Sequence, residues 1–306
     1  MYDVVIVGAG TAGMSAAIYA RRAGKTVLML EEAMYGGQII NASEVENYPG
    51  IQKIPGYQFA NDLHAQAIAL GAEQVTASVS GIEDHGTYKT VQAGDMSYEA
   101  KTVILATGAK NRKIGMEQEE RLVGMGISYC ATCDGAFYRG RTVAVYGGGN
   151  TALGDVEYLA NLCEKVYLIH RRDSFRGNAI LVERLQKKEN VEFLTNRIIV
   201  DLIGEDQLDA LKLKNVVTNE EQELPVEGLF IAIGQEPANT VFAPLVTLDD
   251  YGYIDAGEDC KTNVAGIYAA GDCRTKQVRQ LTTAAADGAV AALAAVEFVN
   301  ELDAAS

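Results

Sequence analysis

The chain repeats one pattern twice, and this repeat constrains its fold more than any other feature. An apolar segment, at residues 4–7 and again at residues 142–146, runs into a turn rich in glycine and then into a helical pattern. A second apolar strand follows in each copy, at residues 26–30 and 166–169. Each copy therefore predicts a βαβ unit, and 306 residues are enough for two such domains. The small residues of the two turns are Gly8, Gly10, Gly13, Gly147, Gly149 and Ala152.

The spacing of these small residues is typical of a turn that binds a dinucleotide. The first glycine permits the tight turn, the second lets the backbone approach a pyrophosphate, and the third small residue lets the helix pack on the strand. The helix N-terminus then presents N–H groups and the positive end of its dipole to the phosphates. One such turn also arises for purely structural reasons, but two in the same context predict two dinucleotide sites. The residues that open the two expected helices are Thr11, Ala12, Asn150 and Thr151.

The residue that follows the second strand indicates which dinucleotide each copy binds. Glu31 stands there in the first copy; a carboxylate accepts hydrogen bonds from both ribose hydroxyls and repels a 2′-phosphate, which suits FAD or NAD. His170 stands there in the second copy and is followed by Arg171, Arg172 and Arg176. Guanidinium groups match phosphate oxygens in charge and geometry, so this cluster predicts the 2′-phosphate of NADPH. The alternative is an ordinary solvated basic surface.

Later strands indicate how the two units are connected. Apolar segments at residues 102–108 and 228–234 close the first and second copies, and a further strand at residues 266–270 follows. The C-terminal segment with this last strand matches no expected element of the second copy. The simplest topology therefore assigns this segment to the first domain. We therefore predict an α/β fold of two Rossmann-like dinucleotide-binding domains, the second inserted into the first. The expected boundaries are residues 1–113 and 244–306 for the outer domain and residues 114–243 for the inserted domain.

Cys130 and Cys133 are the one closely spaced pair among the five cysteines. A structural zinc site needs four ligands, and the sequence offers no second pair or nearby histidine, so we expect no metal. Two intervening residues allow a small disulfide loop, and a short helix over residues 134–138 is expected to lower a thiol pKa at its N-terminus. We interpret the pair as redox-active, with a buried structural pair as the alternative. The other cysteines, interpreted as packed thiols, are Cys163, Cys260 and Cys273.

Composition and charge exclude several classes of protein. With 26 basic and 41 acidic residues the net charge is −15, which repels nucleic-acid phosphates. The most apolar helix pattern, near the C-terminus, contains Asp287 and Glu297, so we expect no membrane span. The first residues enter a strand pattern without a preceding basic segment, which does not fit a secretory signal. A cytoplasmic location is the resulting expectation.

Further short motifs accompany the turns and the cysteine pair. The full set is Gly8-Ala9-Gly10-Thr11-Ala12-Gly13, Gly36-Gly37-Gln38, Glu44-Val45-Glu46-Asn47-Tyr48-Pro49-Gly50, Ala106-Thr107-Gly108, Cys130-Ala131-Thr132-Cys133-Asp134, Gly147-Gly148-Gly149-Asn150-Thr151-Ala152, His170-Arg171-Arg172-Asp173 and Gly271-Asp272 with Arg279-Gln280. With these motifs the chain resembles the low-molecular-weight thioredoxin reductases over nearly its whole length. The resemblance implies a homodimer, FAD in the outer domain, NADPH in the inserted domain, and oxidised thioredoxin as the substrate.

The resemblance also implies roles for single residues. Cys133 is expected to lie against the flavin and accept its electrons, while Cys130 attacks the disulfide of thioredoxin through a mixed disulfide. Asp134 is adjacent and is expected to serve as a general acid; the alternative is a plain helix N-cap. Since the thiols and the NADPH site share one domain, we hypothesise that this domain rotates between two positions relative to the flavin.

The expected cofactor sites combine the turns with residues implied by the resemblance. For FAD they are Gly8, Gly10, Thr11, Ala12, Gly13, Glu31, Gly37, Gln38, Asn47, Val79, Thr107, Gly108, Gly271, Asp272, Arg279, Gln280 and Leu281. For NADPH they are Gly147, Gly149, Asn150, Thr151, Ala152, His170, Arg171, Arg172, Arg176, Ile233 and Gly234. The chain departs from the family pattern at Ala286, at Gly154 and Asp155, and over residues 116–120.

Three rival functions are consistent with parts of the sequence. A flavin dithiol oxidase hands its electrons to oxygen, and a ferredoxin-driven reductase receives them from ferredoxin. Neither needs the arginine cluster that follows the second repeat. A non-catalytic flavoprotein that senses redox state is the alternative from a different class, and the intact cysteine pair with two dinucleotide turns argues against it.

Overall fold

A computed structural model describes residues 1–42 and 44–305 and divides the chain into two compact units. The first unit consists of Met1–Lys110 and the chain from Glu236 onward, and the second unit is Asn111–Gln235. The chain therefore leaves the first unit once and returns to it once. These crossings lie at residues 110/111 and 235/236, where the sequence suggested 113/114 and 243/244.

The first unit is built on a mixed sheet in the order β3-β2-β1-β6-β5-β4, with β17 pairing to β6 as well. The strands β1, β2, β3, β6 and β17 are parallel, and β4 and β5 continue the sheet as an antiparallel hairpin. Pairing of β17 with β6 returns the C-terminal part of the chain to the first unit. The strands are β1 (Tyr2–Val7), β2 (Val27–Glu31), β3 (Glu73–Thr76), β4 (Val79–Asp84), β5 (Lys89–Ala93), β6 (Met96–Leu105) and β17 (Ile267–Ala269).

Small residues let the helices of the first unit pack closely. A Cβ at Gly288 would lie 2.2 Å from the carbonyl oxygen of Ala12, so glycine is required where α7 meets α1. Ala291 and Ala295 of α7 are fully buried in the same core as Ala16 of α1. The helices are α1 (Thr11–Arg22), α2 (Gly56–Ala69) and α7 (Leu281–Ala305), with short 3-10 turns η1 (Gly37–Asn41), η3 (Thr240–Phe242) and η4 (Gly271–Cys273).

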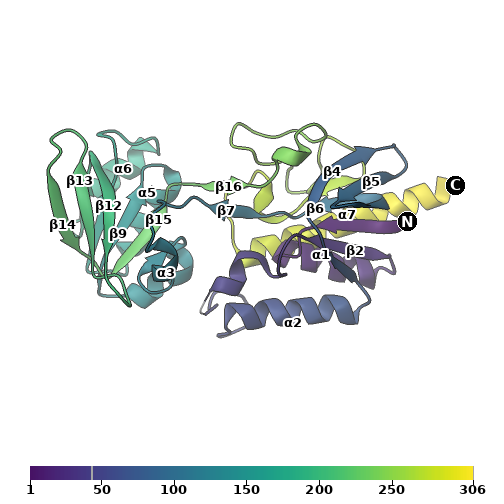
Figure 1. Ribbon diagram of the computed structural model, residues 1–306, viewed down its shortest axis with the longest axis horizontal. Coiled ribbons are helices and arrows are strands. Elements are labelled where there is room, and N and C mark those ends of the chain that lie inside the picture. Colours follow the sequence, from purple (N-terminus) through teal and green to yellow (C-terminus); the bar gives the residue numbers. More distant parts are fainter. Residues whose placement is uncertain (43, 306) are drawn as a thin grey trace. The chain divides into compact units, whose positions relative to one another are not determined.

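Helix α7 is long and apolar enough in composition to cross a membrane. The core helix of a soluble protein meets the same criteria, and α7 packs on α1 inside the first unit (Figure 1).

The second unit is built on a fully parallel sheet in the order β11-β10-β9-β15-β8. An antiparallel sheet of β12, β13 and β14, which the sequence did not reveal, adds a further layer of core (Figure 1). The parallel strands are β8 (Ile127–Ser128), β9 (Thr142–Gly147), β10 (Lys165–Ile169), β11 (Val191–Leu194) and β15 (Gly228–Ala232); the antiparallel ones are β12 (Arg197–Ile203), β13 (Ala210–Asn215) and β14 (Glu221–Pro225). The helices are α3 (Glu119–Leu122), α4 (Ala131–Asp134), η2 (Gly135–Tyr138), α5 (Asn150–Leu159) and α6 (Ala179–Gln186).

The two chain segments that pass between the units pair with each other. They are β7 (Ala109–Asn111) and β16 (Gln235–Pro237), which form a two-stranded sheet. The Gln235 amide donates to Asn111 Oδ1 at 2.9 Å, and the Arg112 N–H donates to the Gly234 carbonyl at 3.0 Å. Both repeats form the expected βαβ units, β1-α1-β2 and β9-α5-β10, and the predicted α/β class with Rossmann-like units is confirmed.

Candidate functional site

The first glycine turn combines close packing with one open position. A Cβ at Gly8 would lie 2.4 Å from the Ala106 carbonyl oxygen, and one at Gly13 would lie 1.9 Å from the Gly8 carbonyl oxygen. Gly10 is different, because a Cβ there would meet nothing within 4 Å. Gly10 is also the N-cap of α1 and supplies no side chain to the helix N–H groups. The turn therefore leaves a helix N-terminus accessible, which is a feature that suits a phosphate.

The second glycine turn has the same design. A Cβ at Gly147 would lie 2.4 Å from the Ala232 carbonyl oxygen, whereas one at Gly149, the N-cap of α5, would meet nothing within 4 Å. The spacing pattern predicted no role for Gly148, and the structure supplies one. The His170 ring fills the space where a Gly148 Cβ would lie, at 2.2 Å from His170 Cε1.

The ends of neighbouring parallel strands gather the predicted residues of each unit at one sheet edge. In the first unit Glu31 ends β2, Gly8 follows β1, Thr107 follows β6 and Gly271 follows β17. In the second unit Gly147 ends β9, His170 follows β10, and Ile233 and Gly234 follow β15. Ligands of open α/β sheets bind at this carboxyl edge, so each unit brings its predicted residues together where a dinucleotide would bind.

Glu31 lies directly against the first glycine turn. Its Oε2 accepts a hydrogen bond from the Ala9 N–H at 2.8 Å. The Gly36 N–H donates to the Ala9 carbonyl at 2.8 Å, which brings the segment of Gly37 and Gln38 alongside the same turn. Val79 opens β4 shortly after Ala77, whose N–H donates to the Glu31 carbonyl at 2.9 Å.

Asp272 is the carboxylate of the first unit whose surroundings most clearly indicate a ligand site. Its Oδ1 is buried without a hydrogen-bond partner among residues 1–42 and 44–305. Burial raises the pKa of Asp272, and Lys276 and Arg279 oppose that rise. A buried oxygen of this kind calls for a donor such as the hydroxyl groups of FAD. The residues therefore fit that cofactor.

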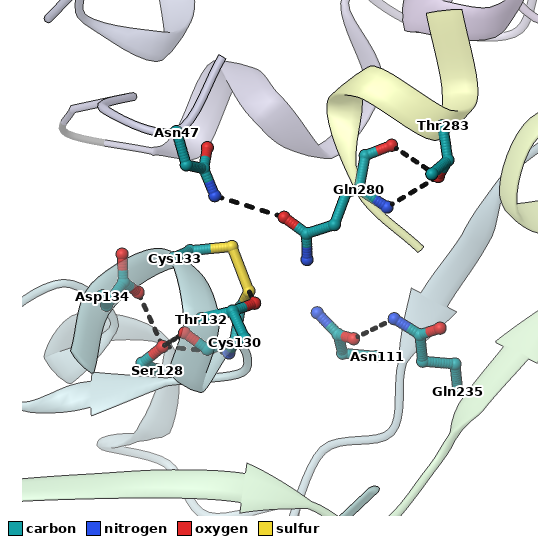
Figure 2. The surroundings of a disulfide bond; sticks show 10 residues. All are labelled: Asn47, Asn111, Ser128, Cys130, Thr132, Cys133, Asp134, Gln235, Gln280 and Thr283. Atoms are coloured by element: carbon teal, nitrogen blue, oxygen red, sulfur yellow. Dashed lines mark hydrogen bonds between the residues drawn. A yellow bond between two sulfur atoms is a disulfide. The ribbon is translucent and has the colours of Figure 1, made fainter. Parts of the chain in front are cut away.

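Residues around the start of α7 complete the predicted flavin set. Asn47 donates to Gln280 Oε1 at 3.2 Å, and Gln280 is held by two hydrogen bonds with Thr283 at 3.1 Å (Figure 2). Arg279 donates to the Asp272 carbonyl at 3.3 Å and stacks over the Tyr253 ring at 4.2 Å. The N-terminal part of the first unit thus contacts its C-terminal part at the residues that the motifs singled out.

The basic segment of the second unit lies beside its glycine turn. Arg171, Arg172 and Arg176 are exposed, and the Arg176 N–H donates to the Gly148 carbonyl at 3.0 Å. His170 itself is buried, and stacks on Phe175 with 5.1 Å between ring centroids. Burial lowers the pKa of His170, and the three arginines lower it further. His170 is thus a neutral ring packed under the turn, and the positive charge comes from the arginines.

The redox pair forms a disulfide at the start of a short helix. Cys130 is the N-cap of α4, and its Sγ is bonded to that of Cys133 (Figure 2). The N–H groups of Cys133 and Asp134 both donate to the Cys130 carbonyl, at 3.2 and 3.1 Å. The expected helix over residues 134–138 was therefore wrong in its start: α4 begins at Ala131, and residues 135–138 form the 3-10 turn η2. The CxxC segment itself is helical because its own N–H groups close the first turn.

Asp134 does not act as a helix cap. It lies at the N-cap position of η2, but its side chain makes no capping hydrogen bond there. Instead Asp134 Oδ2 accepts a hydrogen bond of 2.6 Å from the Ser128 hydroxyl (Figure 2). Burial raises the pKa of Asp134, and the Ser128 hydrogen bond opposes this rise. A carboxyl group with a raised pKa next to a disulfide is more readily protonated than an ordinary carboxyl and is suited to serve as a proton donor.

Similarity to known proteins agrees with this geometry. A model of the family described as pyridine nucleotide-disulphide oxidoreductase matches residues 2–288. The chain belongs to this family. The thioredoxin reductase of Listeria innocua is 43% identical over 303 residues, which are 99% of this chain and 95% of the relative.

Solved structures give the same family at the level of the fold. The crystal structure of thioredoxin reductase from Streptococcus pyogenes matches with a TM-score of 0.94 at 38% identity and covers 98% of this chain and 99% of that one. A ferredoxin-flavin thioredoxin reductase from Clostridium acetobutylicum matches with a TM-score of 0.53 at 30% identity, covering 98% of both chains. The resemblance stated from the sequence motifs is confirmed.

The sequence motifs did not single out Glu119 of this disulphide oxidoreductase. Glu119 is buried and accepts hydrogen bonds from the N–H groups of Ile114 and Gly115 and from the Tyr129 hydroxyl at 2.6 Å. It thereby ties the chain entering the second unit to the residue before Cys130. The signal was present as the unusual segment 116–120, but its spacing carried no recognisable motif.

The three remaining cysteines are buried and unbridged, as expected for packed thiols. Burial raises the pKa of Cys163 to about 11 and that of Cys260 to about 12, and it raises the pKa of Cys273 as well. Thiols with raised pKa values are poor nucleophiles at neutral pH. Within the described residues, no group of three or more metal-ligating side chains converges.

Proposed function

We propose that the Cys130–Cys133 disulfide is the working centre of an NADPH-dependent thioredoxin-disulfide reductase. The observation that carries this assignment is a CxxC disulfide in the same unit as a dinucleotide turn flanked by three exposed arginines. Full-length relatives at 42–43% identity are named thioredoxin reductase. The chain is a flavoenzyme of that kind, with oxidised thioredoxin as its protein substrate.

The first unit supplies the flavin site. Asp272 offers an unpartnered buried oxygen to a hydroxyl, Glu31 lies at the end of β2 where a ribose binds, and Gly10 leaves the α1 N-terminus open. Bound at these residues, FAD would supply a two-electron carrier between NADPH and a disulfide. In the second unit, Gly149 and the exposed Arg171 and Arg172 are placed to hold the phosphates of NADPH.

The reduced cysteines then carry the electrons to thioredoxin. The Cys130 thiolate attacks one sulfur of the thioredoxin disulfide, an intermolecular disulfide forms, and the other thioredoxin sulfur leaves as a thiolate. The Cys133 thiolate next attacks Cys130 Sγ, which restores the Cys130–Cys133 disulfide and releases the second thioredoxin sulfur. Two electrons pass to thioredoxin, and two protons complete its dithiol. Asp134 donates a proton to a leaving sulfur.

A comparison of electron donors tests this assignment. Purified FAD-loaded protein is mixed with oxidised thioredoxin and supplied with NADPH, NADH or reduced ferredoxin, and thioredoxin thiols are counted. We expect NADPH to support the fastest reduction. Faster turnover with ferredoxin, the donor named for the Clostridium acetobutylicum protein, would replace NADPH with that donor. Oxygen consumption without thioredoxin reduction would instead identify a dithiol oxidase.

The assembly and location of the enzyme follow from the same assignment. The resemblance to thioredoxin reductases supports a homodimer, and a reducing cytoplasm suits an enzyme whose three other cysteines stay unbridged. A net charge of −15 disfavours binding to nucleic acid. Sedimentation of the FAD-loaded protein at micromolar concentration measures its oligomeric state, and a monomer mass would reject the dimer.

A further inference from the structure

Ser128 lies next to the segment of Cys130, Cys133 and Asp134, and its hydroxyl oxygen contacts three polar atoms of that segment. It is the last residue of β8 and is 4% exposed. Its Oγ accepts from the Cys130 N–H at 3.0 Å, lies 2.6 Å from Asp134 Oδ2, and lies 3.3 Å from the Cys130 carbonyl oxygen (Figure 2). A parallel strand thus fixes a hydroxyl between the first redox cysteine and the acid that follows the second.

The hydroxyl has one proton but two possible acceptors. When Asp134 is ionised, the proton belongs in the shorter contact, because a charged acceptor makes the stronger hydrogen bond. When Asp134 is protonated, its own O–H donates to Ser128 Oγ, and the serine proton is then free to turn to the Cys130 carbonyl. In both arrangements the Cys130 N–H keeps its acceptor, and no atom of the group loses its partner.

We propose that Ser128 is a positioning residue that holds Asp134 beside the redox disulfide in both protonation states, by turning its single proton between Asp134 Oδ2 and the Cys130 carbonyl. The proposal rests on the proposed function, in which Asp134 supplies the proton to a leaving sulfur. Ser128 touches neither substrate nor cofactor in this role. It keeps the acid in one orientation while the proton comes and goes.

The other titratable groups around Asp134 determine how this role is measured. Tyr138, on η2, interacts electrostatically with Asp134, and burial raises its pKa above the ordinary tyrosine range. Helix α5 packs against α4 and carries Asp155, Glu157 and Tyr158. Burial raises the pKa of Asp155 to about 7, so the ionisation of this carboxyl would also appear in a pH profile. An Asp155→Asn background separates the two ionisations.

The test measures the pH dependence of thioredoxin reduction by the FAD-loaded protein in this background. Ser128→Ala should lower the turnover number about fivefold, the usual worth of one neutral hydrogen bond. It should also move the ionisation of Asp134 to higher pH, since the carboxylate loses its donor. The infrared carbonyl band of protonated Asp134 reports the same ionisation in protein that is not turning over. The band is assigned by its loss in Asp134→Asn.

Two substitutions provide the controls. Ser128→Thr keeps the hydroxyl and should restore both the rate and the ionisation. Ser15→Ala removes another buried hydroxyl, which donates to the Ala285 carbonyl at 2.7 Å in the first unit, and should change neither. Should Ser128→Ala fail to fold, Ser128→Cys takes its place, because a thiol is a weak donor of similar size.

The outcomes distinguish this proposal from the proposed function. If Asp134→Asn keeps the ionisation and the rate, the acid role of Asp134 is wrong whatever Ser128 does. If Asp134→Asn loses both while Ser128→Ala matches the parent in rate, ionisation and infrared band, the role of Ser128 is overturned and that of Asp134 stands. A threonine variant that behaves like the alanine variant also counts against the proposal.

Discussion

At the scale of single residues, Cys130 separates the two halves of the reaction in the proposed mechanism. Cys130→Ser removes the sulfur that attacks thioredoxin and leaves Cys133 beside the flavin in the proposed mechanism. We expect thioredoxin reduction to fall to background, while NADPH still bleaches the visible absorbance of the FAD-loaded protein under nitrogen. Cys163→Ala, which removes a buried unbridged thiol of the same unit, should leave turnover within about twofold. Full activity of Cys130→Ser would reject the assigned roles.

We predict that Arg171 and Arg172 decide the choice of coenzyme. Both are exposed beside the second glycine turn, where a 2′-phosphate is expected. Replacing both with alanine should raise the KM for NADPH about tenfold or more, because hydrogen bonds to a charged group are lost, and should leave the KM for NADH nearly unchanged. Arg139→Ala removes another exposed arginine of the same unit and serves as the control. Equal effects on both coenzymes would argue against a 2′-phosphate at this position.

At the scale of elements, Asp287 of α7 holds the turn that carries Asp272. Its carboxylate accepts hydrogen bonds from the Gly271 N–H at 2.9 Å, from Arg274 Nε at 2.8 Å and from Lys276 Nζ at 2.8 Å. The side chains of Asp287, Arg274 and Lys276 are almost completely buried. The network thereby connects a core helix to the loop that carries the buried Asp272 Oδ1, the atom proposed to bind the flavin cofactor.

Asp287→Asn should therefore loosen FAD as well as the fold. Removing one partner of a buried ion pair costs about 3 kcal/mol of unfolding free energy, because Arg274 and Lys276 lose their counter-charge. We expect a lower melting temperature and weaker FAD binding, measured by flavin fluorescence on dilution. Lys212→Met, which breaks an exposed pair with Glu221, should change neither by more than a small amount. Unchanged FAD binding in a destabilised variant would assign Asp287 to stability alone.

The same network predicts a direction for the pH dependence of stability. Burial alone would raise the pKa of Asp287, but the hydrogen bonds from Arg274 and Lys276 leave it below the usual range. A carboxyl with a depressed folded pKa stabilises the fold above its unfolded pKa and loses that stabilisation as the pH falls through the folded value. Denaturant unfolding should therefore show a steeper loss of stability below about pH 4 in the parent than in Asp287→Asn.

At the scale of the whole molecule, the working groups are divided between the units. The disulfide and the second glycine turn belong to the second unit, whereas Asp272 and the first glycine turn belong to the first. The disulfide and the coenzyme must both exchange electrons with one flavin. We therefore predict that the second unit takes two positions during turnover.

A cross-link between the units tests this prediction. Two cysteines are introduced on exposed positions, one in each unit, and joined by a thioether linker while the native pair is oxidised. Turnover should fall at least about tenfold, because a fixed arrangement serves only one of the two transfers. Each single cysteine, modified with the same reagent, shows the effect of the label alone. Unchanged turnover of the cross-linked protein would rule out the movement.

Local sequence patterns predicted much of the site because their causes are local. The spacing Gly8-x-Gly10-x-x-Gly13 specifies a turn whose packing depends on neighbouring residues, and Glu31 follows at a fixed distance along the βαβ unit. The pair Cys130 and Cys133 predicts a small disulfide loop for the same reason. The sequence predicted a helix from residue 134, but the helix begins at Ala131, because the backbone of the CxxC segment closes its own first turn.

Contacts between polar side chains that no motif links were decided only by the tertiary structure. The pairs Asp287 with Arg274, Glu119 with Tyr129, and Asp134 with Ser128 have no spacing that distinguishes them from ordinary surface residues. Burial brings each donor and acceptor together, since an unpaired polar group in a core is unfavourable. The chain alone therefore specified the two dinucleotide turns and the redox cysteines, while packing chose the residues that hold a cofactor loop and an acid in place.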